Sequence, residues 1–283
     1  MEEIFALEHV FFHIGFAGYI VATILYIAYL FVQNEGVGKL GSIIAFFGLI
    51  THTVSLVIRT INAERLPLNN QFEFATCFAW GIVLCYLFLE KKFQFKYRGL
   101  GAFVMPIGTL VMGYAFSLPK DIVDPMPALQ SYWLLIHVGV SVIAYGAFAV
   151  ACGISVLYLL KSRHFAKNPD SNPHSIYHKY FPDLRMLDDM NYKTIAIGFL
   201  FLTLCILSGA VWAEQAWARY WSWDPKETWS LITWIVYALF LHARFTRGWR
   251  GNKTAWFAII GFICVLITYI GVNIFLPSIH SYA

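Results

Sequence analysis

The chain has 283 residues, of which 59% are hydrophobic and only 13% are charged, and its formal net charge is +4. Soluble domains carry about 25% charged residues, so this composition, with a mean hydropathy of +0.63, excludes an ordinary soluble protein and indicates an integral membrane protein. The few basic residues lie in loops, so we expect them to set the orientation of the chain in the membrane and not to bind nucleic acid. Membrane lipid is the expected environment of the chain.

Apolar runs long enough to cross a membrane recur along the whole chain. About 20 helical residues span a hydrocarbon core of about 30 Å. On this criterion the sequence predicts eight transmembrane helices, at residues 9–32, 41–61, 72–90, 100–117, 131–160, 192–213, 226–245 and 254–276. We therefore expect residues 1–283 to form a single polytopic membrane domain, an all-α bundle of about eight helices with an external tryptophan-rich loop.

The basic residues predict on which side of the membrane each loop lies. Lys and Arg concentrate in loops 90–99, 161–191 and 244–253, which alternate along the chain so as to share one side. The positive-inside rule makes that side cytoplasmic. Both termini and the tryptophan-rich segment are then expected on the extracytoplasmic side of a plasma membrane, with Arg59 and Arg65 as exceptions to the rule.

Residues 212–229 hold half of the chain's ten tryptophans. They are Trp212, Trp217, Trp221, Trp223 and Trp229. Tryptophan collects at membrane interfaces as an amphipathic anchor, and that is one interpretation. An interfacial belt does not require charged residues between the rings, however, and Arg219, Asp224 and Lys226 stand there. The second interpretation is a flat aromatic platform for a large planar ligand, with charges that meet its polar edge.

The run Asp224-Pro225-Lys226-Glu227 carries the signals of a helix start: a capping Asp, a Pro at the first helical position and a Glu in the first turn. A helix is therefore predicted to begin at the tryptophan cluster. The positive end of its dipole would favour an anionic group there.

Histidines are the candidate ligands of a metal-bearing group. His137, near one end of the fifth predicted helix, and His280, beyond the end of the last, are both expected on the side of the tryptophan segment. Two such histidines match axial ligation of a haem iron from both faces, whereas either one alone would favour an interfacial or hydrogen-bonding role. Arg219 and Lys226 could then pair with haem propionates, with Arg59 and Arg65 as second candidates.

Two further histidines lie within predicted spanning helices. An ionisable residue in such a helix is costly and is a functional hypothesis by default. His242 fits this description, although near a helix end it could simply snorkel or bond a carbonyl. For His52, in the middle of the second predicted helix, a hydrogen-bonded structural role is expected.

Several blocks of the sequence resemble one family of membrane proteins. The run W-x-W-D-P-K-E-x-W-S-L at 221–231 resembles the WWD signature of haem-handling proteins. The surrounding blocks are similar to the CcsA (ResC-like) family of the System II cytochrome c biogenesis machinery. They are P-A-L-Q-S-Y-W-L-L-I-H-V at 127–138, L-H-A-R-F-T-R-G-W-R-G at 241–251, I-H-S-Y at 279–282 and P-L-N-N-Q-F-E-F at 67–74.

This resemblance implies a haem transport and ligation protein that acts as one subunit of a holocytochrome c synthase. Haem b would enter from the cytoplasmic side and pass a site in the membrane, where His242 and a histidine of a CcsB (ResB-like) subunit are its ligands. It would then be presented outside between His137 and His280. There its vinyl groups would react with the thiols of a C-x-x-C-H motif in apocytochrome c. Thiol-reducing proteins are expected as indirect partners.

No catalytic residue is expected in this chain, because the cofactor and the apocytochrome bring the reactive groups and the protein supplies orientation. Whether the chain counts as an enzyme by itself stays open. Two alternatives remain. One is delivery of haem to a chaperone, as in other WWD proteins, which have fewer or many more helices. The other is a b-type electron-transfer protein, which would need paired histidines within the bilayer.

Overall fold

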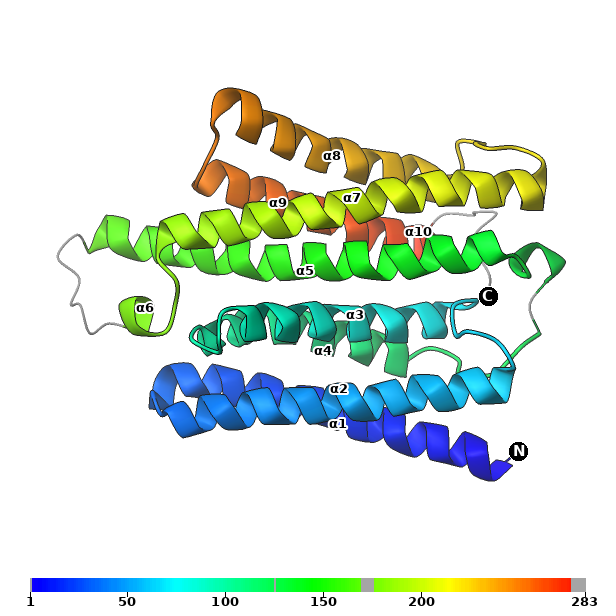
Figure 1. Cartoon of the computed structure of the whole chain (residues 1–283), viewed down its shortest axis with the longest axis horizontal. Helices are drawn as coiled ribbons and strands as arrows, with labels where there is room; N and C mark the ends of the chain where they lie inside the picture. Colours follow the sequence, from blue (N-terminus) through cyan, green and yellow to red (C-terminus); the bar gives the residue numbers. More distant parts are fainter. Residues whose placement is uncertain (1, 125, 169–175, 276–283) are drawn as a thin grey trace.

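The structure is a computed structural model that describes residues 2–124, 126–168 and 176–275 (Figure 1). Its long helices are α1 (Glu2–Val32), α2 (Glu35–Ala63), α3 (Gln71–Lys92), α4 (Gly101–Phe116), α5 (Tyr132–Lys167), α7 (Leu184–Trp217), α8 (Pro225–Arg247) and α9 (Asn252–Leu266). The last of these continues through the π-helical turn η3 (Ile267–Gly271) into α10 (Val272–Phe275). The described residues contain no strand, so the all-α prediction is confirmed.

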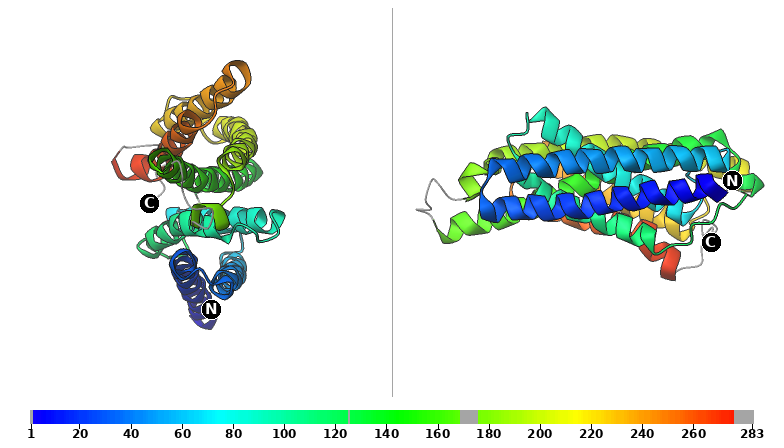
Figure 2. Two further views of the ribbon diagram at one scale, coloured as in Figure 1. Left: turned by 90° about the vertical axis from the view of Figure 1, so that its left-hand side faces the viewer. Right: turned by 90° about the horizontal axis from the view of Figure 1, so that it is seen from below.

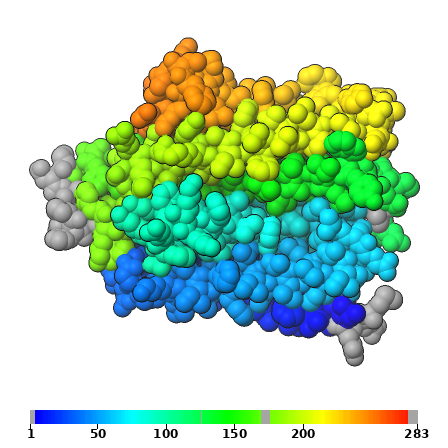
Figure 3. All heavy atoms as spheres, in the orientation of Figure 1, coloured from blue at the N-terminus to red at the C-terminus, as the bar shows by residue number. Residues whose placement is uncertain are grey.

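The helices are arranged in pairs that stack across the bundle (Figures 1 and 2). The α1–α2 pair lies at one edge, α3 and α4 come next, then α5 with α7, and finally α8 with α9. Helix α5 contacts α3, α4, α7 and α9. Of the most apolar stretch of α5, 83% is buried, compared with 28% for α1 and for α7. Helix α5 is therefore the axis of the bundle, and α3 and α7 cover much of it in the space-filling view (Figure 3).

Seven of the described helices are long and apolar enough to cross a membrane. Helix α8 has a comparable length of 23 residues but falls outside this group, because Trp, Ser, Thr and basic residues interrupt its aliphatic run. It nevertheless packs against α7 and α9 within the bundle. The prediction of an integral membrane bundle is confirmed, and the eight expected segments each correspond to one long helix.

Helix α7 is longer than the predicted 192–213. It begins at Leu184, where Asp183 accepts a hydrogen bond from the backbone N–H of Met186, and it ends at Trp217. The prediction was too short because it followed the apolar run alone, whereas a helix continues through polar turns until a cap ends it. Trp217 therefore lies on α7 together with Trp212, and the loop proper is only 218–224.

The ends of the helices form two distinct regions (Figure 1). At one end, called here the basic end, lie the connections that follow α3, α5 and α8, which carry the three Lys- and Arg-rich segments. At the other, the tryptophan end, lie the start of α1, the end of α10 and the connections α2–α3, α4–α5 and α7–α8. The predicted alternation of the loops is confirmed; which end faces the cytoplasm remains a prediction.

A buried charge pair joins three helices at the basic end. The guanidinium of Arg244 on α8 donates to the carboxylate of Asp188 on α7. The other oxygen of Asp188 accepts from the backbone N–H of Gly251 at 3.0 Å and from the hydroxyl of Thr254 at 3.1 Å. Because Asp188 thus contacts the ends of both α8 and α9, it sets how these helices sit against α7.

Helices α3 and α5 cross with their backbones in contact. A Cβ added at Gly146 on α5 would lie 2.8 Å from the backbone oxygen of Gly81 on α3. At Gly139, on the same helix, an added Cβ would meet nothing within 4 Å. The crossing therefore requires the missing side chain at Gly146 and not at Gly139.

We expect Gly146→Ala to lower the free energy of unfolding by about 1–3 kcal/mol, because the two helices must move apart. The control, Gly139→Ala, should be neutral or slightly stabilising, since Ala is the better helix former by ~0.5–1 kcal/mol. Thermal unfolding of both purified variants in one detergent measures the difference. Equal melting temperatures would contradict the close crossing.

Candidate functional site

A cavity of about 180 Å³ opens at the tryptophan end of the bundle, and we call it the His137 cavity. Helices α5 and α7 form one side of it and the start of α8 with loop 218–224 a second. The segment 68–70 with the first turn of α3, and the turn from η3 into α10, form the rest. Five separate parts of the chain thus meet here, which only the folded bundle brings together.

The ring of His137 is held firmly in this cavity. Its Nδ1 lies 2.7 Å from the carbonyl oxygen of Cys205 on α7. A carbonyl can only accept, so Nδ1 carries the proton and the lone pair of the ring is on Nε2. This is the tautomer and the kind of supporting hydrogen bond that histidine ligands of metals use. An added Cβ at Gly209 would lie only 2.6 Å from Nδ1, so glycine is required beside the ring.

Trp212 packs against the ring of His137 and supports it. Its side chain is 1% exposed, and its ring is stacked on that of His137 at a centroid distance of 6.2 Å and an angle of 16°. The indole N–H of Trp212 donates to the carbonyl of Ala128 in η2 (Pro127–Leu129) at 2.9 Å. The orientation of the imidazole therefore depends on a tryptophan that is itself anchored to the α4–α5 connection.

The tryptophan rings do not form one flat platform, which corrects the sequence-based interpretation. Trp217 meets Trp212 edge-on at 76°, and Trp223 meets Trp221 at 87°. Trp212 and Trp221 line the cavity, whereas Trp223 is 68% exposed and the half-buried Trp217 and Trp229 are not among the lining residues. Rings on the last turn of a helix and in a tight loop point in different directions, so they cannot share one plane.

The predicted helix start at Asp224 is confirmed. Asp224 is the N-cap of α8, and the carboxylate of Glu227 reaches back to its backbone N–H at 3.2 Å, which completes a capping box. Glu227 also accepts from the backbone N–H of Ser222 at 2.8 Å, so it folds the loop against the helix. Lys226 consequently lines the cavity. Arg219 is exposed and is not a lining residue, so the structure brings one of the two predicted cations to the cavity.

The other two predicted histidine ligands are placed differently. His242 is exposed on α8 and at 1.5 Å per residue lies about 24 Å along the helix from Lys226. His280 lies outside the described residues. Asn273, near the end of α10, lines the cavity. Among the described residues no group of three or more His, Cys, Asp or Glu side chains could hold a metal ion on its own.

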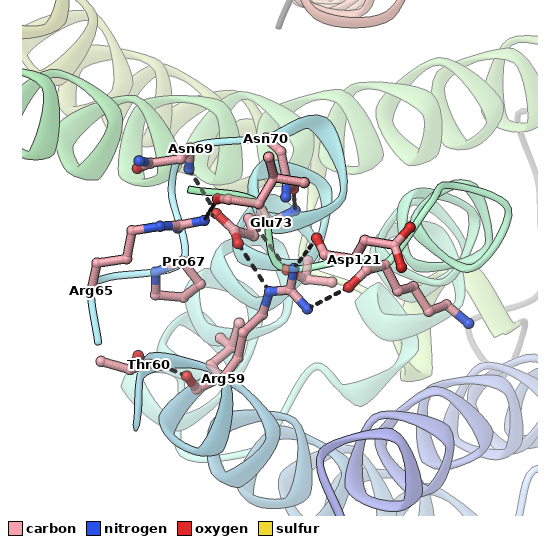
Figure 4. A network of polar contacts seen from close by, with 12 residues as sticks. Arg59, Thr60, Arg65, Pro67, Asn69, Asn70, Glu73 and Asp121 are labelled. Carbon is pink, nitrogen blue, oxygen red and sulfur yellow. Dashed lines mark hydrogen bonds and ion pairs between the residues drawn. The ribbon is translucent and has the colours of Figure 1, made fainter. Parts of the chain in front are cut away.

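Arg59 and Arg65 are not available for the carboxylates of a ligand, which corrects the second-rank prediction. Both guanidinium groups pair with the buried Glu73 (Figure 4). Arg59 also pairs with the buried Glu8. Internal neutralisation also explains why two arginines are tolerated at the end that the charge rule assigns to the outside. His52 is fully buried, and the Tyr19 hydroxyl lies 3.1 Å from its Nδ1, so its ring is hydrogen-bonded as expected, and its structural role stays a prediction.

Sequence reasoning missed several residues of the cavity. Cys205 contributes through its backbone carbonyl, which no sequence pattern reveals. Thr268 and Tyr269 are brought to the cavity by a π-helical turn, a feature that is frequent at functional sites but has no clear sequence signal. Gly209 offered a signal, since glycine inside a helix is costly and usually has a packing reason.

Comparison with known proteins settles the family. The model of the cytochrome C assembly protein family matches residues 68–280. The chain belongs to this family. The matched residues include the last part of the α2–α3 connection, His137 and the tryptophan segment, and extend to His280.

Relatives of similar length are CcsA proteins. The chain is 37% identical to the cytochrome c biogenesis protein CcsA of Guillardia theta over 286 residues, covering 95% of this chain and 94% of the relative. It is 35% identical to CcsA of Synechococcus sp. (strain CC9902) over 291 residues, 95% of each. Within the family the chain is therefore CcsA-like.

The fold is also similar to a solved structure, that of the cytochrome c haem lyase CcmF, with a TM-score of 0.70. The likeness covers 96% of this chain but 47% of the other, so the chain spans about half the length of that protein. At 14% identity this likeness shows the fold alone.

We expect Asp224→Ala to lower the free energy of unfolding by about 1 kcal/mol, because the cap of α8 is lost. Asp224→Asn should keep most of the stability, since Asn caps a helix about as well as Asp. Thermal unfolding of the two variants separates capping from charge. If Asn lowered the melting temperature as much as Ala does, the negative charge of Asp224, and not its capping hydrogen bond, would be what stabilises the start of α8.

Proposed function

We propose that this chain carries haem across the membrane and presents it at the His137 cavity to apocytochrome c for thioether attachment, as the CcsA-like subunit of a cytochrome c synthase. The observation that carries the proposal is the orientation of His137. Its Nδ1 proton is bound by the Cys205 carbonyl and its ring is supported by Trp212, beside a cationic Lys226. The names of the relatives, cytochrome c biogenesis proteins, agree with it.

The residues of the cavity fit haem as a substrate. An imidazole with its lone pair on Nε2 suits an iron ligand, Trp212 and Trp221 offer aromatic surface, and Lys226 suits a propionate carboxylate. The volume of about 180 Å³ is below the ~300–1,000 Å³ of pockets that enclose a whole ligand. Haem at His137 would thus stay partly outside the cavity, as its transfer to a second protein requires.

His280 is proposed as the second axial ligand. The described chain ends at Phe275, with Asn273 in the wall of the cavity. A chain reaches at most ~3.6 Å per residue, so His280 can lie up to about 18 Å from Phe275. That reach supports the pairing with His137. Between two such ligands the protein's part is orientation of the reacting groups, which can be worth ~7–11 kcal/mol in the best intramolecular cases.

His242 is proposed as the ligand of a second site within the membrane. Its exposed position on α8 supports a shared ligand set, because the ring is open to a neighbouring subunit. A CcsB-like subunit would supply the partner histidine. The Asp188–Arg244 pair holds the helix end close to His242 in place. In this proposal the basic end faces the cytoplasm of a plasma membrane and the tryptophan end faces outside.

The structure lends little support to a b-type electron-transfer protein. That function needs paired histidines in the bilayer. The two candidates are His52 and His242. His52 is buried beside Tyr19 on the α1–α2 side, whereas His242 is exposed on α8 at the opposite edge of the bundle (Figure 1).

The decisive test is replacement of His137 or His280 by Gly in the complex with the CcsB-like subunit. We expect holocytochrome c formation to fall by about tenfold or more, the usual effect of disturbing a metal site. Added imidazole should restore part of it by occupying the vacated space, and the wild-type complex should show a bis-histidine haem spectrum. The control is His178→Gly, an exposed histidine at the basic end, which should behave as wild type. Full activity of both site variants would refute the proposal.

The second site has its own test. His242→Ala should reduce the haem that co-purifies with the complex, because one ligand is lost. His13→Ala, which also removes an exposed histidine from a helix, is the matched control. Haem content is read from the optical spectrum per mole of protein. An undiminished haem content would return His242 to a structural role.

A further inference from the structure

We propose that Glu73 is a positioning residue for the His137 cavity: its buried carboxylate holds the two connections from which the cavity wall and the support of His137 are built. The inference rests on the proposed function, because it assigns Glu73 a role in haem presentation. Glu73 lies in the first turn of α3, just after the segment that lines the cavity, and its side chain is 0% exposed.

The carboxylate of Glu73 receives three donors from three positions. Its Oε1 accepts from Nε of Arg59 at 3.0 Å. Its Oε2 accepts from Nη1 of Arg65 at 2.8 Å and from the backbone N–H of Asn69 at 2.8 Å. Asn69 is a lining residue of the cavity, so one of these bonds holds the cavity wall directly (Figure 4).

The two arginines extend the same network to the α4–α5 connection. Arg59 donates to the carbonyls of Lys120 at 3.0 Å and Asp121 at 3.3 Å, and Arg65 donates to the carbonyl of Val123 at 3.1 Å. This connection leads to η2, where the carbonyl of Ala128 accepts from the indole of Trp212. Because Trp212 supports the ring of His137, Glu73 is linked to that ring through the arginines, the α4–α5 connection and Trp212.

The charges of the network balance. Arg59, 1% exposed, also pairs with Glu8, 2% exposed, at 2.9 Å, so two arginines face two glutamates. A buried pair of this kind is weak evidence for stability, and its best-supported use is to select one arrangement of the chain. Here the arrangement selected is the position of the segment 65–70 and of residues 120–123 relative to α3.

Glu8 provides a matched comparison. Like Glu73, it is a buried partner of Arg59, so Gln at either position leaves one arginine charge uncompensated. Unlike Glu73, the side chain of Glu8 makes no bond to the connections that form the cavity among the contacts of the described residues. The two substitutions therefore alter the charge equally and the positioning unequally.

The experiment compares Glu73→Gln with Glu8→Gln in the complex with the CcsB-like subunit. We expect Glu73→Gln to weaken the His137-dependent part of the haem spectrum and holocytochrome c formation by about tenfold, the usual cost of losing an outer-shell support. With Glu8→Gln both readouts should stay within about twofold of wild type. This difference between the variants should persist when their melting temperatures are the same. Equal losses in both variants would overturn the positioning role.

Two further variants keep the test decisive. Arg65 is 16% exposed and lies at the edge of the network, so Arg65→Gln breaks one contact between Glu73 and the α4–α5 connection without changing the buried pair of Arg59 and Glu73. If Glu73→Gln fails to fold, Arg65→Gln should show the same loss of holocytochrome c formation. The double variant Arg65→Gln/Glu73→Gln restores the charge balance but not the ion pair between residues 65 and 73. Its holocytochrome c formation should therefore stay low. Recovery of the double variant, or an unchanged Arg65→Gln, overturns the inference.

His137→Gly in the same assay separates the two claims. If it abolishes the signal while Glu73→Gln does not, only the role of Glu73 fails. If His137→Gly has no effect, the proposed function fails and the inference falls with it.

Discussion

The structure depends on one constraint: in an apolar bundle a buried charge is costly unless an opposite charge or hydrogen bonds compensate it. Two charge networks meet this constraint, one at each end. Arg59 and Arg65 with Glu8 and Glu73 join α1, α2, α3 and the α4–α5 connection at the tryptophan end. Asp188 and Arg244 join α7, α8 and the start of α9 at the basic end. Apolar packing alone would let these helices slide, whereas directional ion pairs specify their relative positions.

Between the two ends, close helix contacts shape the cavity. The crossing of α3 and α5 at Gly81 and Gly146 fixes the segment before α3 beside α5. Gly209 lets α7 approach α5 so closely that the Cys205 carbonyl reaches the ring of His137. The histidine of the cavity thus receives its tautomer from the backbone of a neighbouring helix. Its orientation is a property of the packed bundle, not of its own helix.

The fold was largely predictable because the membrane leaves few choices. A backbone in hydrocarbon must satisfy its own hydrogen bonds, so each long apolar run becomes a helix. The start of α8 was also predictable, since Asp224 and Glu227 act within one turn. The errors had a common cause. The length of α7, the pairing of Arg59 and the angles between the tryptophan rings are set by residues that are distant in sequence or lie outside the apolar runs.

The sequence by itself determined the helices, their alternation between two ends, the capped start of α8 and the family, because each rests on local or compositional signals. Only the tertiary structure decided which side chains of the tryptophan segment reach the cavity. Trp212, Trp221 and Lys226 do, whereas Arg219 and Trp223 point elsewhere. It also decided that Arg59 serves the scaffold and not a ligand. Such choices depend on contacts between elements far apart in the chain, and no local pattern encodes the distance between them.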